Sequence, residues 1–332
     1  MKIDKIVILS ILCSFATEVF GTEKLGEKST LSLLTLNLHT YQEISTSGKK
    51  ETDLNRIDAL QRVSNYASIF DTIAHGIDDL KADVICLQEV GEWKDSTLIK
   101  KNSKLNLLSF GNDPTNAVNQ ISNRIKHAKY FNFMDWSHYG WSVWKEGTAI
   151  LSKYPILEQE SRYISNINNG TVDYWQSRKV TRIKVKHSDT KYLNIFSIHS
   201  GWWDSKKEPF QMQFTRLMDW LKLVESKDEV TILCGDFNQP AGGKGYQLMI
   251  QSRAYKDLYL AANSDGMYDR TIDGEIDGWE GDKKGKRVDY LLMNDTMPYK
   301  VVKSKRVFTE SIFGRVSDHY GVYSKIIFIP SK

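Results

Sequence analysis

Four short polar phrases, each at the end of an apolar run, contain the residues that could do chemistry. They are Leu36-Asn37, Gln88-Glu89, Gly235-Asp236-Phe237-Asn238 and Ser317-Asp318-His319, and His199 lies between the second and the third. Carboxylate and carboxamide oxygens are hard ligands that suit Mg²⁺, and histidine transfers protons near neutral pH. If buried strands end in these residues at one rim, the sequence predicts a site for Mg²⁺ and phosphate chemistry.

Asp236 and Asn238 alternate around Phe237. In an extended backbone both polar side chains face one side, while Phe237 packs on the other. A carboxylate beside a carboxamide can bind the water shell of a metal ion and position a nucleophile. A tight turn after a strand is the alternative, because Gly, Asp and Asn all favour turns.

His319 needs a carboxylate other than its neighbour Asp318 to orient it, since adjacent residues in a strand point apart. Asp289, in Arg287-Val288-Asp289-Tyr290, is the natural candidate. A buried carboxylate fixes the tautomer of an imidazole and stabilises its protonated form. His199 ends another apolar run and is expected at the same rim. A single glutamate at the end of a strand, such as Glu89, is more often a capping residue or a member of a salt bridge. Its interpretation as a functional residue therefore depends on the other polar residues expected at the same rim.

The elements that must position these residues are strands covered by two helices. Apolar residues from Asp53 to Leu80 recur at helical spacing and predict one long amphipathic helix, and a second helix is expected to begin near Pro209. Strands mixed with helices that cover a sheet indicate a single α/β sandwich. The predicted strands are 31–37, 83–90, 148–152, 178–186, 192–199, 230–234, 288–293 and 322–329.

The composition is that of a soluble globular protein, with 41% hydrophobic and 26% charged residues among 332. The net charge of +4 is too mild to establish a polyanionic partner. Cys86 and Cys234 lie in apolar strand-like runs, and we expect them to be small buried hydrophobes, with one bridge between neighbouring strands left open.

Residues 1–21 resemble a secretory signal peptide. Lys2 and Lys5 precede an apolar stretch from Ile6 to Phe15, and Val19-Phe20-Gly21 resembles a cleavage site. A buried N-terminal strand or helix is the alternative. The apolar run is too short to span a bilayer comfortably, so no stable membrane insertion is expected. The mature domain, residues 22–332, is therefore expected to be secreted or periplasmic.

Six motifs, taken in order along the chain, resemble those of the endonuclease/exonuclease/phosphatase superfamily. The resemblance implies a four-layer α/β/β/α sandwich with two mixed β-sheets flanked by helices. It also implies phosphoester hydrolysis that depends on Mg²⁺, with Mn²⁺ as the alternative. The motifs are Thr35-Leu36-Asn37, Leu87-Gln88-Glu89-Val90, Gly147-Thr148-Ala149-Ile150-Leu151-Ser152, Gly235-Asp236-Phe237-Asn238, Arg287-Val288-Asp289-Tyr290 and Ser317-Asp318-His319.

The same resemblance implies a role for each matching residue. One departure stands out, because His39 occupies a position where many nuclease members have aspartate, which makes metal ligation from that strand less certain. By resemblance, Glu89 is the principal Mg²⁺ ligand with Asn37 beside it, and Asp318 serves a second metal position. Asp236 aligns the attacking water, and Asn238 holds a phosphate oxygen. His319, oriented by Asp289, contacts the phosphate or relays a proton, and His199 takes the place of the second histidine of deoxyribonuclease-like members.

Longer phrases are similar to the maltose 6'-phosphate phosphatase branch, which implies a sugar phosphate as the small phosphorylated substrate. These phrases are Phe133 to His138, Trp144 to Gly147, His199 to Trp203, Glu208-Pro209-Phe210 and Ile276 to Trp279.

The same stretches contain residues that could bind the substrate. Trp202 and Trp203 follow His199, so at least one indole is expected near the rim, while packing under the helix after Pro209 is the alternative for the other. Asp277 and Trp279 could form part of the same wall. Arg178 could offer a planar donor to the phosphate or could be a surface cation.

Other functions remain open at the level of the sequence. A secreted nuclease is the main alternative, since Lys283-Lys284-Gly285-Lys286-Arg287 could track the backbone of a nucleic acid or could be a solvated loop. A sphingomyelinase would need an exposed aromatic hairpin, and none is evident. A secreted binding module without catalysis is the alternative from a different class, and the intact set of polar residues argues against it. The oligomeric state stays unknown.

Overall fold

The computed structural model describes residues 29–44, 49–95, 113–141, 143–166, 174–188, 191–252 and 255–329. The predicted signal peptide, residues 1–21, lies outside the described residues.

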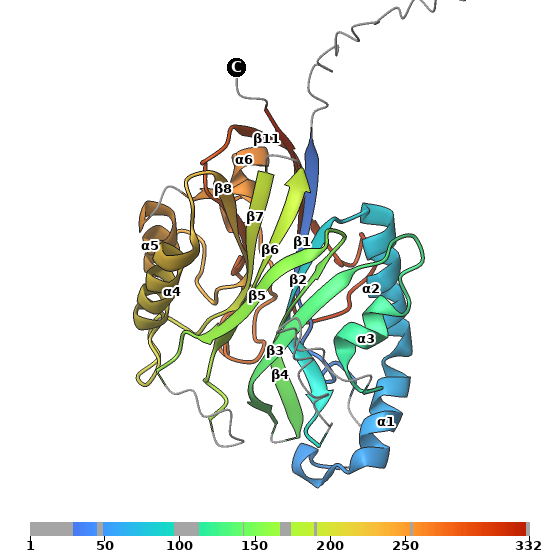
Figure 1. Ribbon diagram of the computed structural model, residues 1–332. Coiled ribbons are helices and arrows are strands. Elements are labelled where there is room, and N and C mark those ends of the chain that lie inside the picture. The colour runs from blue at the N-terminus through green and yellow to red at the C-terminus, as the bar shows by residue number, and fades with distance from the viewer. Residues whose placement is uncertain are drawn as a thin grey trace, which may run out of the picture.

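Two six-stranded mixed β-sheets face each other at the centre of the molecule (Figure 1). The first sheet has the order β11-β12-β1-β2-β4-β3 and the second has the order β5-β6-β7-β8-β10-β9. Strands of the first sheet are β1 (Thr30–Asn37), β2 (Val84–Trp93), β3 (Phe131–Gly140), β4 (Trp144–Ser152), β11 (Tyr299–Val307) and β12 (Gly321–Phe328). Strands of the second are β5 (Ile156–Tyr163), β6 (Lys179–Ser188), β7 (Lys191–His199), β8 (Glu229–Asp236), β9 (Lys256–Asp257) and β10 (Asp289–Met293).

Helices cover the outer faces of both sheets, so the molecule is the four-layer sandwich that the family resemblance implied (Figure 1). The side of the first sheet carries α1 (Arg56–Asn65), α2 (Ala67–Leu80) and α3 (Ala117–Ser122), and the side of the second carries α4 (Phe210–Val224) and α5 (Lys244–Ser252). The short helix α6 (Leu258–Ala262) and the 3₁₀ turns η1 (Glu51–Asp53) and η2 (Gly266–Tyr268) complete the described elements. None of the helices in the described ranges has the length and apolar character that crossing a bilayer requires.

Three hydrophobic cores result from the period-two alternation of the strands. In β2, Ile85 and Leu87 pack under the helices, whereas Val84 and Cys86 face the second sheet. Cys234 lies in the same core between the sheets, and both thiols are free and buried. The third core lies between the second sheet and α4.

The region predicted as one long helix forms two. α1 ends and α2 begins on either side of Tyr66, whose ψ of −2° departs from helical geometry. Its ring is buried and lies 5.3 Å from that of Tyr41 and 5.8 Å from that of Phe70. We attribute the interruption to the burial of this ring, which a periodicity of apolar positions does not reveal.

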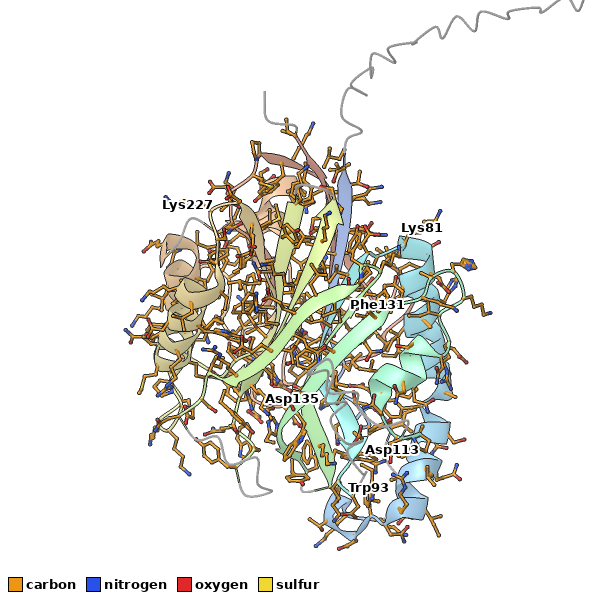
Figure 2. All side chains as sticks on the ribbon, in the orientation of Figure 1. Lys81, Trp93, Asp113, Phe131, Asp135 and Lys227 are labelled. Atoms are coloured by element: carbon orange, nitrogen blue, oxygen red, sulfur yellow. The ribbon has the colours of Figure 1, made fainter. Side chains whose placement is uncertain are left out.

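Strand direction brings the polar strand ends together. β1 is parallel to β2 in one sheet, and β7 is parallel to β8 in the other. Asn37 at the end of β1 contacts Asp236 at the end of β8, so the carboxyl ends of the two pairs lie at the same end of the sandwich. β10 runs antiparallel to β8 and therefore begins there, with Asp289 opposite Asp236. Figure 2 shows Lys81 and Lys227, which precede β2 and β8, at one end of the molecule and Trp93, the last residue of β2, at the other.

Candidate active site

Glu89 reaches the rim through a bulge in β2. The pairing register of β2 with β4 shifts between Leu87 and Val90, and Glu89 itself has a φ of +47°. A bulge re-aims a side chain out of the normal alternation of a strand. A left-handed conformation at a residue other than glycine is strained and is typical of functional sites. The bulge therefore turns Glu89 toward the cavity.

Asn37 joins two carboxylates that are distant in the sequence. It is fully buried, and its Nδ2 donates to Glu89 Oε1 at 2.9 Å and to Asp236 Oδ2 at 3.2 Å. Its own oxygen accepts the backbone N–H of His39 at 3.1 Å. In this arrangement the amide positions the carboxylates, and its oxygen is engaged with the chain.

His199 faces the same two carboxylates from β7. Its Nε2 lies 3.7 Å from Glu89 Oε1 and 3.6 Å from Asp236 Oδ2. The ligand-type atoms of Glu89, His199 and Asp236 all lie within 4.8 Å of one another. Two carboxylates and one imidazole at this separation form a donor set that suits a divalent cation.

His319 is held by Asp289, as the alternation argument predicted. Its Nδ1 lies 2.9 Å from Asp289 Oδ2, and its Nε2 lies 3.8 Å from Asp236 Oδ2. Burial opposes the charged ring, but Asp289 and Asp236 outweigh that cost and raise the pKa of His319 well above its usual value. The other oxygen of Asp289 is buried and has no hydrogen-bond partner among the described residues.

Asn238 lies beside Asp236 by a turn, not by continued extension of the strand. Its φ is +50°, and its backbone N–H donates to Asp236 Oδ1 at 2.8 Å. Its Nδ2 donates to the carbonyl of Ser200 at 3.0 Å, and its Oδ1 accepts from Trp279 Nε1 at 3.2 Å. Phe237 packs in the third core, so the predicted separation of its side chain from the two polar ones is present.

The carboxylates of the site hold protons more tightly than usual. Burial, followed by the nearby charge of Glu146, raises the pKa of Glu89 to about 8, and burial and Asp289 raise the pKa of Asp236 to about 7. Burial, then the charge of Arg178, lowers the pKa of His199 well below its ordinary value, so the ring is neutral. Buried carboxylates that resist ionisation beside a neutral imidazole fit a divalent cation, which would supply the missing positive charge.

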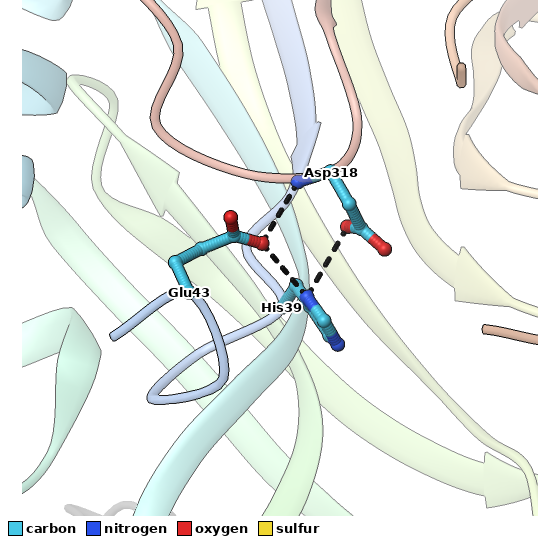
Figure 3. Close-up of side chains that lie close together, drawn as sticks. All are labelled: His39, Glu43 and Asp318. Carbon is cyan, nitrogen blue, oxygen red and sulfur yellow. Dashed lines mark hydrogen bonds and ion pairs between the residues drawn. The ribbon is translucent and has the colours of Figure 1, made fainter. Parts of the chain in front are cut away.

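His39 and Asp318 belong to a second cluster on the cavity wall (Figure 3). His39 Nδ1 lies 2.8 Å from Glu43 Oε1 and 3.5 Å from Asp318 Oδ1, and Glu43 Oε1 accepts the N–H of Asp318 at 3.0 Å. Burial would lower the pKa of His39, but Glu43 and Asp318 raise it to about 10. His39 therefore places a positive charge where the resemblance leads one to expect a carboxylate.

One cavity of about 470 Å³ is lined by most of these groups, namely His39, Glu89, His199, Asp236, Asn238, Asp318 and His319. Arg178, Trp202, Asp277 and Trp279 line it, as expected for substrate-binding residues. Trp203 does not line it, and packs instead against the core under α4, which corrects its assignment to the substrate site. The two adjacent indoles therefore serve different surfaces.

Arg178 is buried in the wall of the cavity and is not a surface cation. Its Nη1 donates to the carbonyl of Trp175 at 2.7 Å, while its Nε is buried and has no hydrogen-bond partner in the part of the chain that the structure describes. The guanidinium lies 5.9 Å from the ring of Trp202. A buried cation with an unsatisfied donor suits an anionic ligand.

The residues that line the cavity but were not singled out by sequence reasoning include His138, Trp141, Glu146 and Trp175. His138 and Glu146 were within the longer phrases similar to the sugar phosphatase branch, and that similarity was the available signal. Although burial opposes ionisation, His138 and then Arg178 hold the pKa of Glu146 below its ordinary value.

The basic run at residues 283–287 does not form a continuous cationic groove. Arg287 is buried and pairs with Asp257 at 2.7 Å, while Lys286 forms an ion pair with Asp282. Two of the four basic side chains in this run are therefore paired with acidic side chains of the protein.

Comparison with known proteins identifies the family. The model of the endonuclease/exonuclease/phosphatase family matches residues 52–319. No curated protein matches the chain.

Three solved structures illustrate the likeness of fold. A family protein from Leptotrichia buccalis is 23% identical, with 89% of this chain and 99% of that chain covered and a TM-score of 0.68. The mannosyl-6-phosphatase Bt3783 of Bacteroides thetaiotaomicron is 16% identical, with 90% and 100% covered and a TM-score of 0.52. Truncated TDP2 of Caenorhabditis elegans is 16% identical, with 90% and 98% covered and a TM-score of 0.54. With the cluster of carboxylates and histidines described above, the match of the family model leads to one conclusion: the chain belongs to the endonuclease/exonuclease/phosphatase family and is a metal-dependent phosphoester hydrolase.

Proposed function

We propose that this protein is an exported, Mg²⁺-dependent phosphomonoesterase that acts on a sugar phosphate or a similar small substrate. One observation carries the proposal: the acidic cluster and Arg178 lie in a single cavity of about 470 Å³ whose walls include Trp202 and Trp279. A cavity of this size encloses a small ligand, and flat indoles suit the apolar face of a sugar. The similarity of fold to a mannosyl-6-phosphatase supports the same substrate class.

The residues of the cavity divide the work of hydrolysis. Glu89 and His199, with Asn37 aligning the first, would hold Mg²⁺, which supplies Lewis-acid stabilisation of the phosphate charge when bound. Asp236 aligns the attacking water, which attacks in line without a covalent enzyme intermediate. Arg178 donates to a phosphate oxygen. Asn238 Nδ2 donates to Ser200 O at 3.0 Å and to Asp236 Oδ2 at 3.3 Å, and it would turn its second N–H from Asp236 to the phosphate.

Protonated His319 donates from Nε2, because its Nδ1 is engaged by Asp289 at 2.9 Å. The acceptor of the Nε2 proton is a phosphate oxygen or the oxygen of the leaving group. Asp318 remains the candidate for a second metal position, in competition with its ion pair to His39.

A screen of three ester classes tests the function. Each is incubated with Mg²⁺ or Mn²⁺, with EDTA as the control: sugar phosphates are followed by phosphate release, plasmid DNA by gel electrophoresis, and sphingomyelin by release of phosphocholine. We expect turnover of sugar phosphates that EDTA abolishes. Cleavage of DNA without turnover of any monoester would replace the proposal with the nuclease. Hydrolysis of sphingomyelin alone would replace it with the phosphodiesterase, for which Trp141, 48% exposed just after β3, is the feature to examine.

A protein with no turnover of any of these esters would be a binding module. Its ligand would then be sought by adding phosphorylated compounds and measuring thermal stabilisation. Export is tested separately by mass spectrometry of the mature N-terminus, which is expected at residue 22.

A further inference from the structure

His138 and Glu146 form a pair in the cavity wall that has no place in the hydrolytic steps above. They lie opposite each other on β3 and β4, and both line the cavity. His138 is buried, and the side chain of Glu146 is 16% exposed. A buried carboxylate that faces a substrate cavity must have a favourable partner or function, because its desolvation is costly.

The surroundings fix the position of one oxygen of Glu146. His138 Nδ1 lies 2.9 Å from the carbonyl oxygen of Ser177, and that oxygen can only accept, so Nδ1 is the donor. The opposite nitrogen, Nε2, then faces Glu146 Oε2 at 3.3 Å. Gly140 leaves room for the same oxygen, since a Cβ there would lie 2.0 Å from it.

The other oxygen, Glu146 Oε1, accepts no hydrogen bond from any residue of the described ranges. Nor does Glu146 belong to any of the groups of described residues whose ligand atoms lie within 4.8 Å of one another. Glu146 is near enough to Glu89 for its charge to raise the pKa of that carboxyl group, but it is not a member of the group formed by Glu89, His199 and Asp236. A fixed negative acceptor repels a phosphate group but accepts hydrogen bonds from neutral hydroxyl groups.

We propose that Glu146, positioned by His138 and Gly140, recognises the hydroxyl groups of the sugar that leaves on hydrolysis. This inference rests on the proposed function and specifies the substrate as a polyhydroxylated monoester. Trp202 and Trp279 supply apolar surface in the same cavity, and Glu146 selects among ligands that present hydroxyl groups. A site built to bind a hydroxyl group discriminates strongly against analogues that lack it.

The test compares two substrates in matched variants. Glu146→Gln keeps the shape of the side chain and removes its charge. Steady-state kcat/KM is measured for a hexose phosphate and for p-nitrophenyl phosphate, which carries no hydroxyl group. We expect the ratio of the two values to fall about 10- to 100-fold, as for the loss of a hydrogen bond to a charged group. Glu158→Gln makes the same chemical change on β5 at a side chain that is 52% exposed, and should leave the ratio unchanged.

Gly140→Ala provides a second variant that keeps the carboxylate but displaces it. Because the atom in its way is the end of a flexible side chain, the fold should tolerate the methyl group, and the thermal midpoint verifies this. The same fall in the ratio is expected.

Each outcome decides between the possibilities. An equal loss on both substrates in Glu146→Gln would overturn the recognition role while leaving the phosphomonoesterase intact, because Glu146 would then act on the phosphate or the metal. A wild-type protein that hydrolyses only p-nitrophenyl phosphate would also overturn it. A wild-type protein that hydrolyses neither would reject the proposed function together with this inference.

Discussion

Asp289→Asn is the sharpest test of the proposed chemistry. Asp289 is buried and its Oδ2 lies 2.9 Å from His319 Nδ1, so the substitution removes a negative charge without changing the size of the side chain. A neighbouring opposite charge shifts a pKa by about 1–3 units, and each unit corresponds to about 1.4 kcal/mol. Protonation of His319 should therefore become about 1.4–4 kcal/mol less favourable.

The sign of the pH effect follows from this shift. The pKa of wild-type His319 is raised, so its proton is present through neutral pH and is lost only when the pH rises through that higher value. In Asp289→Asn the ring loses its proton at lower pH, while burial continues to oppose its charge. If His319 donates a proton or a charged hydrogen bond, kcat should fall about 10²- to 10⁴-fold. The deficit should be larger at pH 8 than at pH 6.

The assay is phosphate release with saturating divalent metal, recorded as kcat and kcat/KM from pH 5 to pH 9. Asp219→Asn, at a side chain of α4 that is 62% exposed, is the matched control. A variant at residue 289 that keeps kcat within threefold of wild type, with the same pH profile, would refute the role given to His319. Near-equal thermal midpoints of the two variants would show that loss of folding is not the cause.

Three further predictions address the metal, the phosphate and the fold. Glu89 holds its proton up to about pH 8 and Asp236 up to about pH 7, so metal binding should release protons. The apparent affinity for the metal should therefore rise with pH, by up to about tenfold per pH unit for each proton released. Titration calorimetry in two buffers measures this, and an affinity that is flat from pH 6 to 8 would contradict it. Arg178→Lys removes the planar donor set and should lower kcat/KM about 10- to 100-fold in the phosphate-release assay, and a change below threefold would count against its contact with phosphate. Gly235→Ala should destabilise the protein by about 3 kcal/mol or more in urea unfolding, because φ is +145° and the new Cβ would lie 1.9 Å from Ile198 O; an unchanged midpoint would contradict the geometry.

The strands that the sequence predicted are mostly the central ones. β1, β2, β7, β8 and β10 are buried on both faces and appear as apolar runs, which are visible without knowledge of the fold. Four strands that were missed, β3, β5, β9 and β11, are all at the edges of the sheets. Edge strands carry polar and charged residues that discourage further pairing, so their hydrophobic pattern is weak.

The sequence by itself determined the types of residue at the strand ends and the choice of Asp289 over Asp318 as the partner of His319. Local alternation was enough for these, because it acts over neighbouring residues. Only the tertiary structure decided which groups meet across the rim, since Asn37 and Asp236 are 199 positions apart in the sequence. It likewise separated Trp202 from Trp203 and paired His138 with Glu146. These outcomes depend on sheet order, bulges and side-chain burial, which arise when distant segments pack together and leave no local pattern in the chain.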